Sequence, residues 1–253
     1  MSSFKSIRQV YKQSLLHFKN SHLSVSRVYC VLCGERCNKT DTFKSTFLCS
    51  ACKKDLPIIN NPCQVCGMPL SLKSSTKICG SCLNNAPFYQ QSLIPLQYNF
   101  PVTSLVKQLK FNNKFIYSEI LSQILLEKIQ QGSSSFPEYI IPVPLHFYRL
   151  IKRGFNQSEL IAKSLSCQLE IPVDLKCCKR IRNTPHQTGF TINERNKNIR
   201  NAFSVNGTFS AKHIAIVDDV VTTGSTVNEL ARMFQKSGVE KIEIWAAART
   251  ILD

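Results

Sequence analysis

The sequence lacks a long apolar stretch and is poor in acidic residues. No run of about 18 apolar residues occurs, so we expect no membrane-spanning helix. The N-terminal segment has neither the continuous apolar core nor the small-residue cleavage site of a signal peptide, which favours a cytoplasmic protein. Only 16 Asp and Glu oppose 32 Lys and Arg, and the resulting net charge of +16 favours partners that carry phosphate.

Cysteine is scarce outside one region, because nine of the 12 cysteines lie between Cys30 and Cys82. Four C-x2-C pairs follow one another there, and each pair can present two thiolates to one metal ion. We predict two structural zinc sites built from successive pairs. Their ligands would be Cys30, Cys33, Cys49 and Cys52 in the first site, and Cys63, Cys66, Cys79 and Cys82 in the second.

Two alternatives to this zinc assignment stay open. Disulfides would require an oxidising compartment, which nothing in the sequence indicates. A cross-braced arrangement would pair the same cysteines in a different order. Cys37 is a ninth thiol in the region, and we do not expect it to bind metal. Sites closed by four cysteines have no open coordination position, so the metal is expected to fold this region and not to catalyse.

The segment Ile214–Thr226 carries the clearest signal for a ligand site. Four apolar residues predict a short buried strand, His213–Val217, which two adjacent carboxylates, Asp218 and Asp219, follow. A loop rich in hydroxyl groups then leads into a predicted helix, Val227–Lys236. A loop at a helix N-terminus offers backbone N–H groups to a phosphate, and two carboxylates beside it suit vicinal sugar hydroxyls or Mg²⁺. The segment therefore predicts a site for a ribose 5-phosphate.

This segment resembles the phosphoribosyl-diphosphate (PRPP) motif of type I phosphoribosyltransferases. The resemblance implies that Asp218 and Asp219 hold the 2- and 3-hydroxyls of the ribose, that the following loop holds the 5-phosphate, and that Mg²⁺ accompanies PRPP. The PRPP-binding residues implied in this way are Asp218, Asp219, Val220, Val221, Thr222, Thr223, Gly224, Ser225 and Thr226.

Two further basic segments fit such a site. After the strand that ends at Val143, Arg149, Arg153 and Gly154 form a predicted pyrophosphate loop, because guanidinium groups bind phosphate oxygens at two points. The segment from Lys179 to Phe203 is polar, basic and interrupted by proline and glycine. We expect a loop there that closes over bound PRPP and excludes water.

The remaining pattern predicts an α/β fold. Strands alternate with helices, which favours a mainly parallel sheet flanked by helices, preceded by a small double zinc-ribbon module. Besides His213–Val217, the expected strands are Ser92–Tyr98, Tyr139–Val143, Ala202–Val205 and Lys241–Ala248. Besides Val227–Lys236, the expected helices are Pro101–Phe111, Lys114–Gln131 and Asn156–Gln168. The expected domains are an N-terminal amphipathic helix in residues 1–27, the double ribbon in 28–88 and the phosphoribosyltransferase-like domain in 91–253.

The N-terminal segment Ser2–Asn20 places apolar residues at helical spacing among basic ones. A basic amphipathic helix of this kind either docks on its own protein or lies on a membrane surface. We favour docking on the protein.

Taken together, these motifs resemble the ComF family of competence proteins, which pair a zinc-ribbon region with a phosphoribosyltransferase-type domain. The motifs are P-V-P-L-H with R-G-F-N-Q (142–157), R-x-T-P-x-Q (182–187), E-R-N (194–196), D-D-V-V-T-T-G-S-T (218–226) and A-R-T (248–250). The segment 182–195 also resembles the hood of amidophosphoribosyltransferases, with Arg182, Gln187 and Arg195 as its implied ligand contacts. The chain has no N-terminal catalytic cysteine of that enzyme class, which argues against a complete glutamine-dependent amidotransferase.

The resemblance implies a role in natural transformation, in which a cytoplasmic protein at the inner membrane helps the DNA-uptake machinery to handle single-stranded DNA. Residues 1–90 hold 12 Lys and Arg against 3 Asp and Glu, and this excess is consistent with direct DNA binding, with Phe43, Phe47 and Phe88 as stacking residues. The alternative is an enzyme that transfers the phosphoribosyl group of PRPP to a small amine or base. A regulator that binds PRPP without chemistry would have the same sequence features.

Overall fold

A computed structural model describes residues 29–37, 47–71, 76–133, 135–183, 199–206 and 209–251. The chain divides into two compact units, residues 1–54 and 55–253. The division falls between the two cysteine groups, so the second group belongs to the same unit as the α/β fold. The predicted N-terminal helix lies outside the described residues.

The smaller unit contains the first cysteine group. Gly34 closes its first knuckle with φ +76°, and its N–H donates to the carbonyl of Cys30 at 2.9 Å. The second knuckle leads into the short helix α2 (Ser50–Lys54), which begins directly after Cys49. In the larger unit α3 (Gly80–Asn84) follows Cys79 in the same way. Each ribbon thus ends in one turn of helix.

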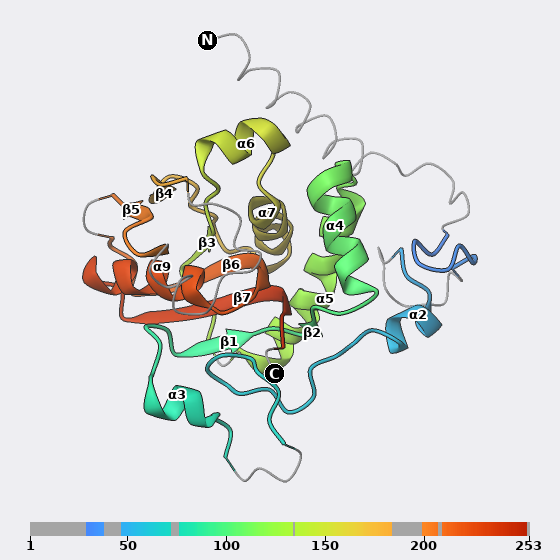
Figure 1. Ribbon diagram of the computed structural model, residues 1–253, viewed down its shortest axis with the longest axis horizontal. Helices are drawn as coiled ribbons and strands as arrows, with labels where there is room; N and C mark the ends of the chain where they lie inside the picture. The colour runs from blue at the N-terminus through green and yellow to red at the C-terminus, as the bar shows by residue number, and fades with distance from the viewer. Residues whose placement is uncertain are drawn as a thin grey trace. The chain divides into compact units, whose positions relative to one another are not determined.

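A parallel sheet forms the centre of the larger unit, with the strand order β1-β7-β6-β3 (Figure 1). Its two long strands pair with each other along their full length and are buried on both faces, as their nearly continuous apolar sequences require. The strands are β1 (Gln91–Leu93), β2 (Leu96–Gln97), β3 (Tyr139–Pro142), β6 (His213–Val221) and β7 (Lys241–Arg249), with β2 also paired to β7.

Helices cover both faces of this sheet (Figure 1). They are α4 (Val102–Asn112), α5 (Ile116–Gly132), α7 (Gln157–Leu169) and α9 (Ser225–Lys236). On one face Ala215 and Val217 pack with apolar residues of α5 and α7. On the other face Ile214 and Ile216 pack with α9. This alternation follows from the two-residue period of β6, and it confirms the predicted mainly parallel sheet flanked by helices.

Two local features differ from the sequence predictions. The expected strand at 202–205 forms as β5 (Phe203–Val205), but it pairs antiparallel with β4 (Cys178–Arg180) in a separate two-stranded sheet. The segment expected as a pyrophosphate loop contains helix α6 (Phe147–Arg153). This helix has no internal glycine or proline, and it is capped by His146 at its start and by left-handed Gly154 at its end. Among the described residues no helix is both long and apolar enough to cross a membrane.

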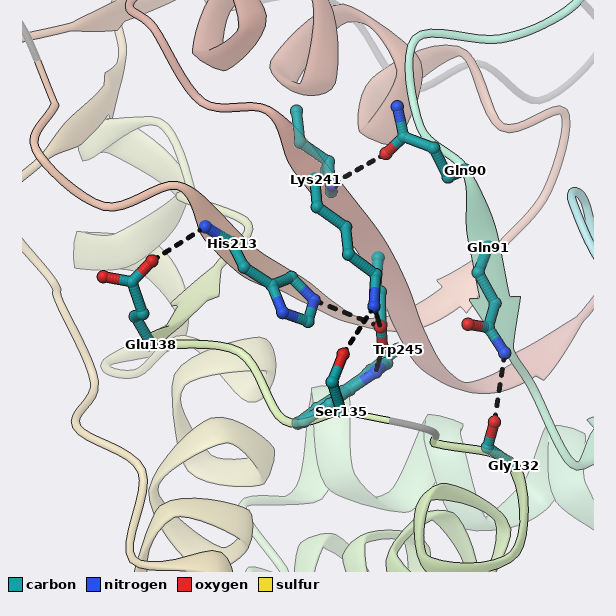
Figure 2. Close-up of polar contacts among 10 residues, drawn as sticks. Gln90, Gln91, Gly132, Ser135, Glu138, His213, Lys241 and Trp245 are labelled. Atoms are coloured by element: carbon teal, nitrogen blue, oxygen red, sulfur yellow. Dashed lines mark hydrogen bonds and ion pairs between the residues drawn. The ribbon is translucent and has the colours of Figure 1, made fainter.

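A buried carboxylate fixes the amino ends of the two long strands. Glu243 of β7 is fully buried, and its Oε1 lies 3.1 Å from His213 Nε2 and 3.1 Å from Lys241 Nζ. Trp245 Nε1 donates to its other oxygen at 2.9 Å. Figure 2 shows the side chains of His213, Lys241 and Trp245 converging on this point. Three donors therefore offset the cost of burying one charge and hold β6 and β7 in register.

We predict that Glu243→Ala lowers the free energy of unfolding of the larger unit by about 3–5 kcal/mol, because it leaves buried donors without their acceptor. Urea denaturation followed by the fluorescence of Trp245, the single tryptophan of the chain, measures this change. Glu240→Ala is the matched control, since Glu240 pairs with Lys212 at the surface and its loss should leave stability nearly unchanged. Equal stability of the two variants would contradict the role assigned to Glu243.

Candidate functional site

The predicted ligand segment lies at the carboxyl end of the sheet. The structure extends β6 to Val221, so Asp218 and Asp219 lie within the strand and not after it. The extension has a tertiary cause, because β7 continues to Arg249 and pairs with β6 through Val221. Ligands of open parallel sheets bind at this end of the strands.

The loop after β6 turns directly into helix α9. Gly224 caps the helix with φ +83°, a left-handed conformation that favours glycine. The hydroxyls of Thr223 and Ser225 lie 2.7 Å apart. A small hollow here is lined by Asp218, Val220, Val221, Thr222, Gly224, Thr226 and Val227. The first turn of α9 directs N–H groups and the positive end of its dipole to this place, which suits an anion.

Side chains from two helices hold the carboxylate pair. Ser158 Oγ donates to Asp218 Oδ1 at 2.9 Å, and Gln157 Nε2 donates to Asp219 Oδ1 at 3.1 Å. Lys110, from the end of α4, forms an ion pair with the other oxygen of Asp219. The two carboxylates are thus fixed by α4 and α7, although both belong to β6.

The electrostatics of this pair favour a cationic or hydrogen-bonding partner. Burial, together with the adjacent charge of Asp219, raises the pKa of Asp218 to about 7, while the charge of Lys110 acts in the opposite direction. A positively charged partner beside Asp218 would favour its ionised form.

The basic residues predicted for the pyrophosphate loop come from α6. Arg153 Nη1 donates to Gln157 Oε1 at 2.6 Å, so a chain of contacts joins Arg153 through Gln157 to Asp219. Burial lowers the pKa of Arg153, while the charge of Asp219 raises it. Arg149 lies on the same helix and is half-buried. The arrangement places positive charge close to the carboxylates.

The residues implied for the hood are only partly described. Arg182 Nη1 donates to the carbonyl of Arg200 at 3.0 Å, whereas Gln187 and Arg195 lie outside the described residues. Arg180, in β4, is close enough to Arg149 and Asp218 to interact electrostatically with both. Burial lowers the pKa of Arg180 to about 10.

Sequence reasoning did not assign Lys110, Gln157, Ser158 or Arg180 to the site. Gln157 was visible only as part of the R-G-F-N-Q motif, and Lys110 stands in an ordinary amphipathic helix. Their convergence on two aspartates depends on the packing of α4 and α7 against the sheet, for which the sequence carries no local signal.

The predicted zinc ligands form two groups in successive order, as expected. In each group the four Sγ atoms lie within 4.8 Å of one another. The Sγ atoms of Cys33 and Cys49 are 3.7 Å apart, and those of Cys66 and Cys79 are 3.6 Å apart. A tetrahedral zinc ion with Zn–S bonds of about 2.3 Å requires sulfur separations of about 3.8 Å, which these distances match. All 12 cysteines are free of disulfide bonds, and Cys37 does not belong to either group.

The thiols also have the electrostatics of a cation site. Burial raises the pKa of Cys63, but backbone N–H groups outweigh it and bring the pKa down to about 7. One such donor is the N–H of Cys79, 3.2 Å from Cys63 Sγ. Burial and the neighbouring thiols raise the pKa of Cys82 far above its usual range. Thiols gathered this closely favour a cation that stabilises their thiolate forms. These properties support structural zinc in both groups.

Comparisons with known families agree with this geometry. The double zinc ribbon domain family matches residues 26–83, and the phosphoribosyl transferase domain family matches residues 151–250. Fold and site thus define a zinc-ribbon protein with a phosphoribosyltransferase domain.

Similarity to individual proteins narrows this class to one family. Over 209 residues the chain is 36% identical to Competence protein F of Haemophilus influenzae, across 80% of this chain and 90% of the relative. It is 34% identical over 208 residues to DNA utilization protein YhgH of Escherichia coli, across 81% and 91%. Competence protein ComFC of Bacillus subtilis is 24% identical over 232 residues, across 85% and 91%. The chain belongs to the competence protein F family, as its motifs indicated.

We predict that the purified chain carries two zinc ions, because both cysteine groups have the geometry of closed sites. Cys33→Ser combined with Cys52→Ser should reduce the content to one, measured by plasma mass spectrometry after gel filtration. Cys167→Ser, which changes an exposed cysteine outside both groups, is the control and should retain two. A double variant that kept both ions would show that the first group is not a zinc site.

Proposed function

We propose that this chain is a competence-type factor that helps to handle single-stranded DNA during natural transformation, with a phosphoribosyltransferase-like domain that binds PRPP and Mg²⁺. The relatives named for competence and for DNA utilization support the process. The assignment of PRPP as the ligand rests on the convergence of the aspartate pair, the hydroxyl-rich loop and the α6 arginines at one end of the sheet.

Each part of the site matches one part of PRPP. Asp218 and Asp219 would accept hydrogen bonds from the 2- and 3-hydroxyls of the ribose. The loop 222–226 would bind the 5-phosphate through backbone N–H groups and hydroxyls. Arg149 and Arg153, with the backbone at Gly154, would bind the diphosphate, whose remaining charge Mg²⁺ would neutralise.

Lys110 and Gln157 give this assignment a physical basis. Two adjacent carboxylates repel each other, and the ion pair of Lys110 with Asp219 offsets part of this repulsion. Gln157 joins Asp219 to Arg153, so the sugar end and the diphosphate end of the site share one hydrogen-bond chain. A ligand with a diol and a diphosphate would use both ends together.

Single-stranded DNA fits the surface beside this site. Four exposed aromatic residues, termed here the aromatic rim, are Phe111, Phe115, Phe147 and Tyr148. Phe111 follows Lys110 in α4, and Phe115 directly precedes α5. Phe147 and Tyr148 lie in α6, the helix that also supplies Arg149 and Arg153. The guanidinium of Arg153 lies 5.9 Å from the centre of the Phe111 ring. Aromatic faces beside guanidinium groups bind bases by stacking and backbone phosphates by charge.

The proposed place of action is the cytoplasm, at the inner face of the membrane where uptake machinery would deliver a strand. The cysteines support a reducing compartment, because none of the 12 forms a disulfide.

Asp218→Asn combined with Asp219→Asn should abolish PRPP binding, because amides cannot supply the negative charge that the ribose hydroxyls and the cation require. Calorimetry in the presence of Mg²⁺ measures this loss, and circular dichroism with zinc content checks the fold. Asp55→Asn, at an exposed position, is the matched control and should bind as the unchanged chain does. In a competent host, the unchanged gene but not the double variant should restore transformation to a deletion strain. Full affinity in the double variant, or normal transformation in the deletion strain, would overturn this assignment.

Phe147→Ala combined with Tyr148→Ala should weaken the binding of a short oligothymidylate at least tenfold, because stacking contributes about 1–3 kcal/mol per base. Fluorescence anisotropy at fixed salt measures the affinity. Phe136→Ala removes an exposed aromatic outside the aromatic rim and serves as the control. An equal loss of affinity in both variants, or no loss in either, would show that the aromatic rim does not bind the oligothymidylate.

A further inference from the structure

The second cysteine group is built into the α/β fold. Its first knuckle is attached to the edge of the sheet, because Ser92 N, in β1, donates to the carbonyl of Gln64 at 2.9 Å. The chain leaving the ribbon is attached to α9, because Phe88 N donates to Asn228 Oδ1 at 2.8 Å. The ribbon thus connects β1 with the helix that follows the phosphate loop.

An arginine is buried beside that loop. Arg249, the last residue of β7, is 4% exposed and lies in register with Val221 of β6. Within the described part of the chain, its Nε and Nη1 atoms have no hydrogen-bond partner. A buried guanidinium without an acceptor is costly, so a native partner for these groups is expected.

Two neighbourhoods meet at Arg249. On one side, a Cβ added to Gly224 would stand 3.9 Å from Arg249 Nη1 and 3.6 Å from Tyr89 Oη, so both side chains lie against the loop. On the other side is the second cysteine group. Arg249 is close enough to Cys66 of this group, and to Tyr89, to interact electrostatically with both.

With zinc bound, the second cysteine group would supply the negative charge and the hydrogen-bond acceptors that the Arg249 guanidinium lacks. Four thiolates and one Zn²⁺ carry a net charge of −2, and thiolate sulfurs accept hydrogen bonds from N–H groups. The first cysteine group belongs to the other compact unit.

We propose that the second zinc site, acting through Arg249 and Tyr89, holds the phosphate loop 222–226 in its binding conformation. Zinc–thiolate charge fixes the guanidinium, which supports left-handed Gly224 and adds positive potential behind the loop. Arg249 is then a positioning residue, and the second ribbon is part of the ligand site. The inference rests on the proposed binding of PRPP.

Arg249→Met should lower the affinity for Mg²⁺-PRPP at least tenfold while the chain keeps two zinc ions. Arg249→Lys retains the charge but loses the planar donor group, and it should bind with intermediate affinity. Lys212→Met is the control, because Lys212 pairs with Glu240 at the surface and directly precedes β6 at its amino end. Unchanged affinity in a folded Arg249→Met variant would overturn the proposal.

Removal of zinc from each site separates this role from general folding. Cys66→Ser with Cys82→Ser should lose one zinc ion and most PRPP affinity. Cys33→Ser with Cys52→Ser should lose one zinc ion and retain PRPP affinity. Equal affinity in the two double variants would contradict a special role of the second site.

Hydrogen exchange without ligand distinguishes failure of this inference from failure of the proposed function. Amides of residues 222–226 should exchange several-fold faster in Arg249→Met than in the unchanged chain, while amides of α5 keep their rates. If the unchanged chain does not bind PRPP, the proposed function fails, and faster loop exchange in Arg249→Met still supports the positioning role. Unchanged exchange and unchanged affinity would reject it.

Discussion

The parallel pairing of β6 with β7 is the constraint on which the rest of the structure depends. Eight residue pairs join the two strands, from His213 beside Lys241 to Val221 beside Arg249. At the amino end this register brings three donors to buried Glu243. At the carboxyl end it carries the aspartate pair past the point where the apolar run stops. A shift of one residue would turn every side chain of a strand to the opposite face. It would therefore disrupt both the contacts of Glu243 and the aspartate site.

Buried charge is concentrated at these two ends, and each end is neutralised differently. The carboxylate of Glu243 has a full set of donors within the sheet, so it serves stability. At the other end Asp219 depends on Lys110 and Gln157, which come from α4 and α7. The attraction within such a buried ion pair is close in magnitude to the cost of removing its charges from water, so a ligand that binds nearby can change this balance. The same reasoning applies to Arg249, whose balance we assign to zinc–thiolate charge. The ligand site thus combines groups that are only partly satisfied by the protein itself.

Much of this architecture could be predicted from the sequence. The C-x2-C spacing specified both cysteine groups and their order, because four thiolates around one ion leave few arrangements. Apolar runs located the long strands, and helical periodicity located α4, α5 and α7 to within a few residues. The predicted strand end at Val217 was wrong, since pairing with β7 extends β6 to Val221. Helix α6 was missed because its basic residues suggested a loop, although its caps at His146 and Gly154 were present in the sequence. The contacts of Lys110 with the site could not be predicted, because they depend on tertiary packing alone.

We propose that the phosphoribosyl site takes part in DNA handling. A calorimetric titration of the zinc-loaded chain with PRPP and Mg²⁺, repeated in the presence of a short single strand with a 5-phosphate, tests this role. We expect that PRPP binds and that the strand changes the affinity of the chain for PRPP, by competition at the phosphate loop or by coupling through the aromatic rim. PRPP binding that the strand leaves unchanged would contradict the claim and would favour a phosphoribosyl-transferring enzyme whose acceptor is a small amine or base.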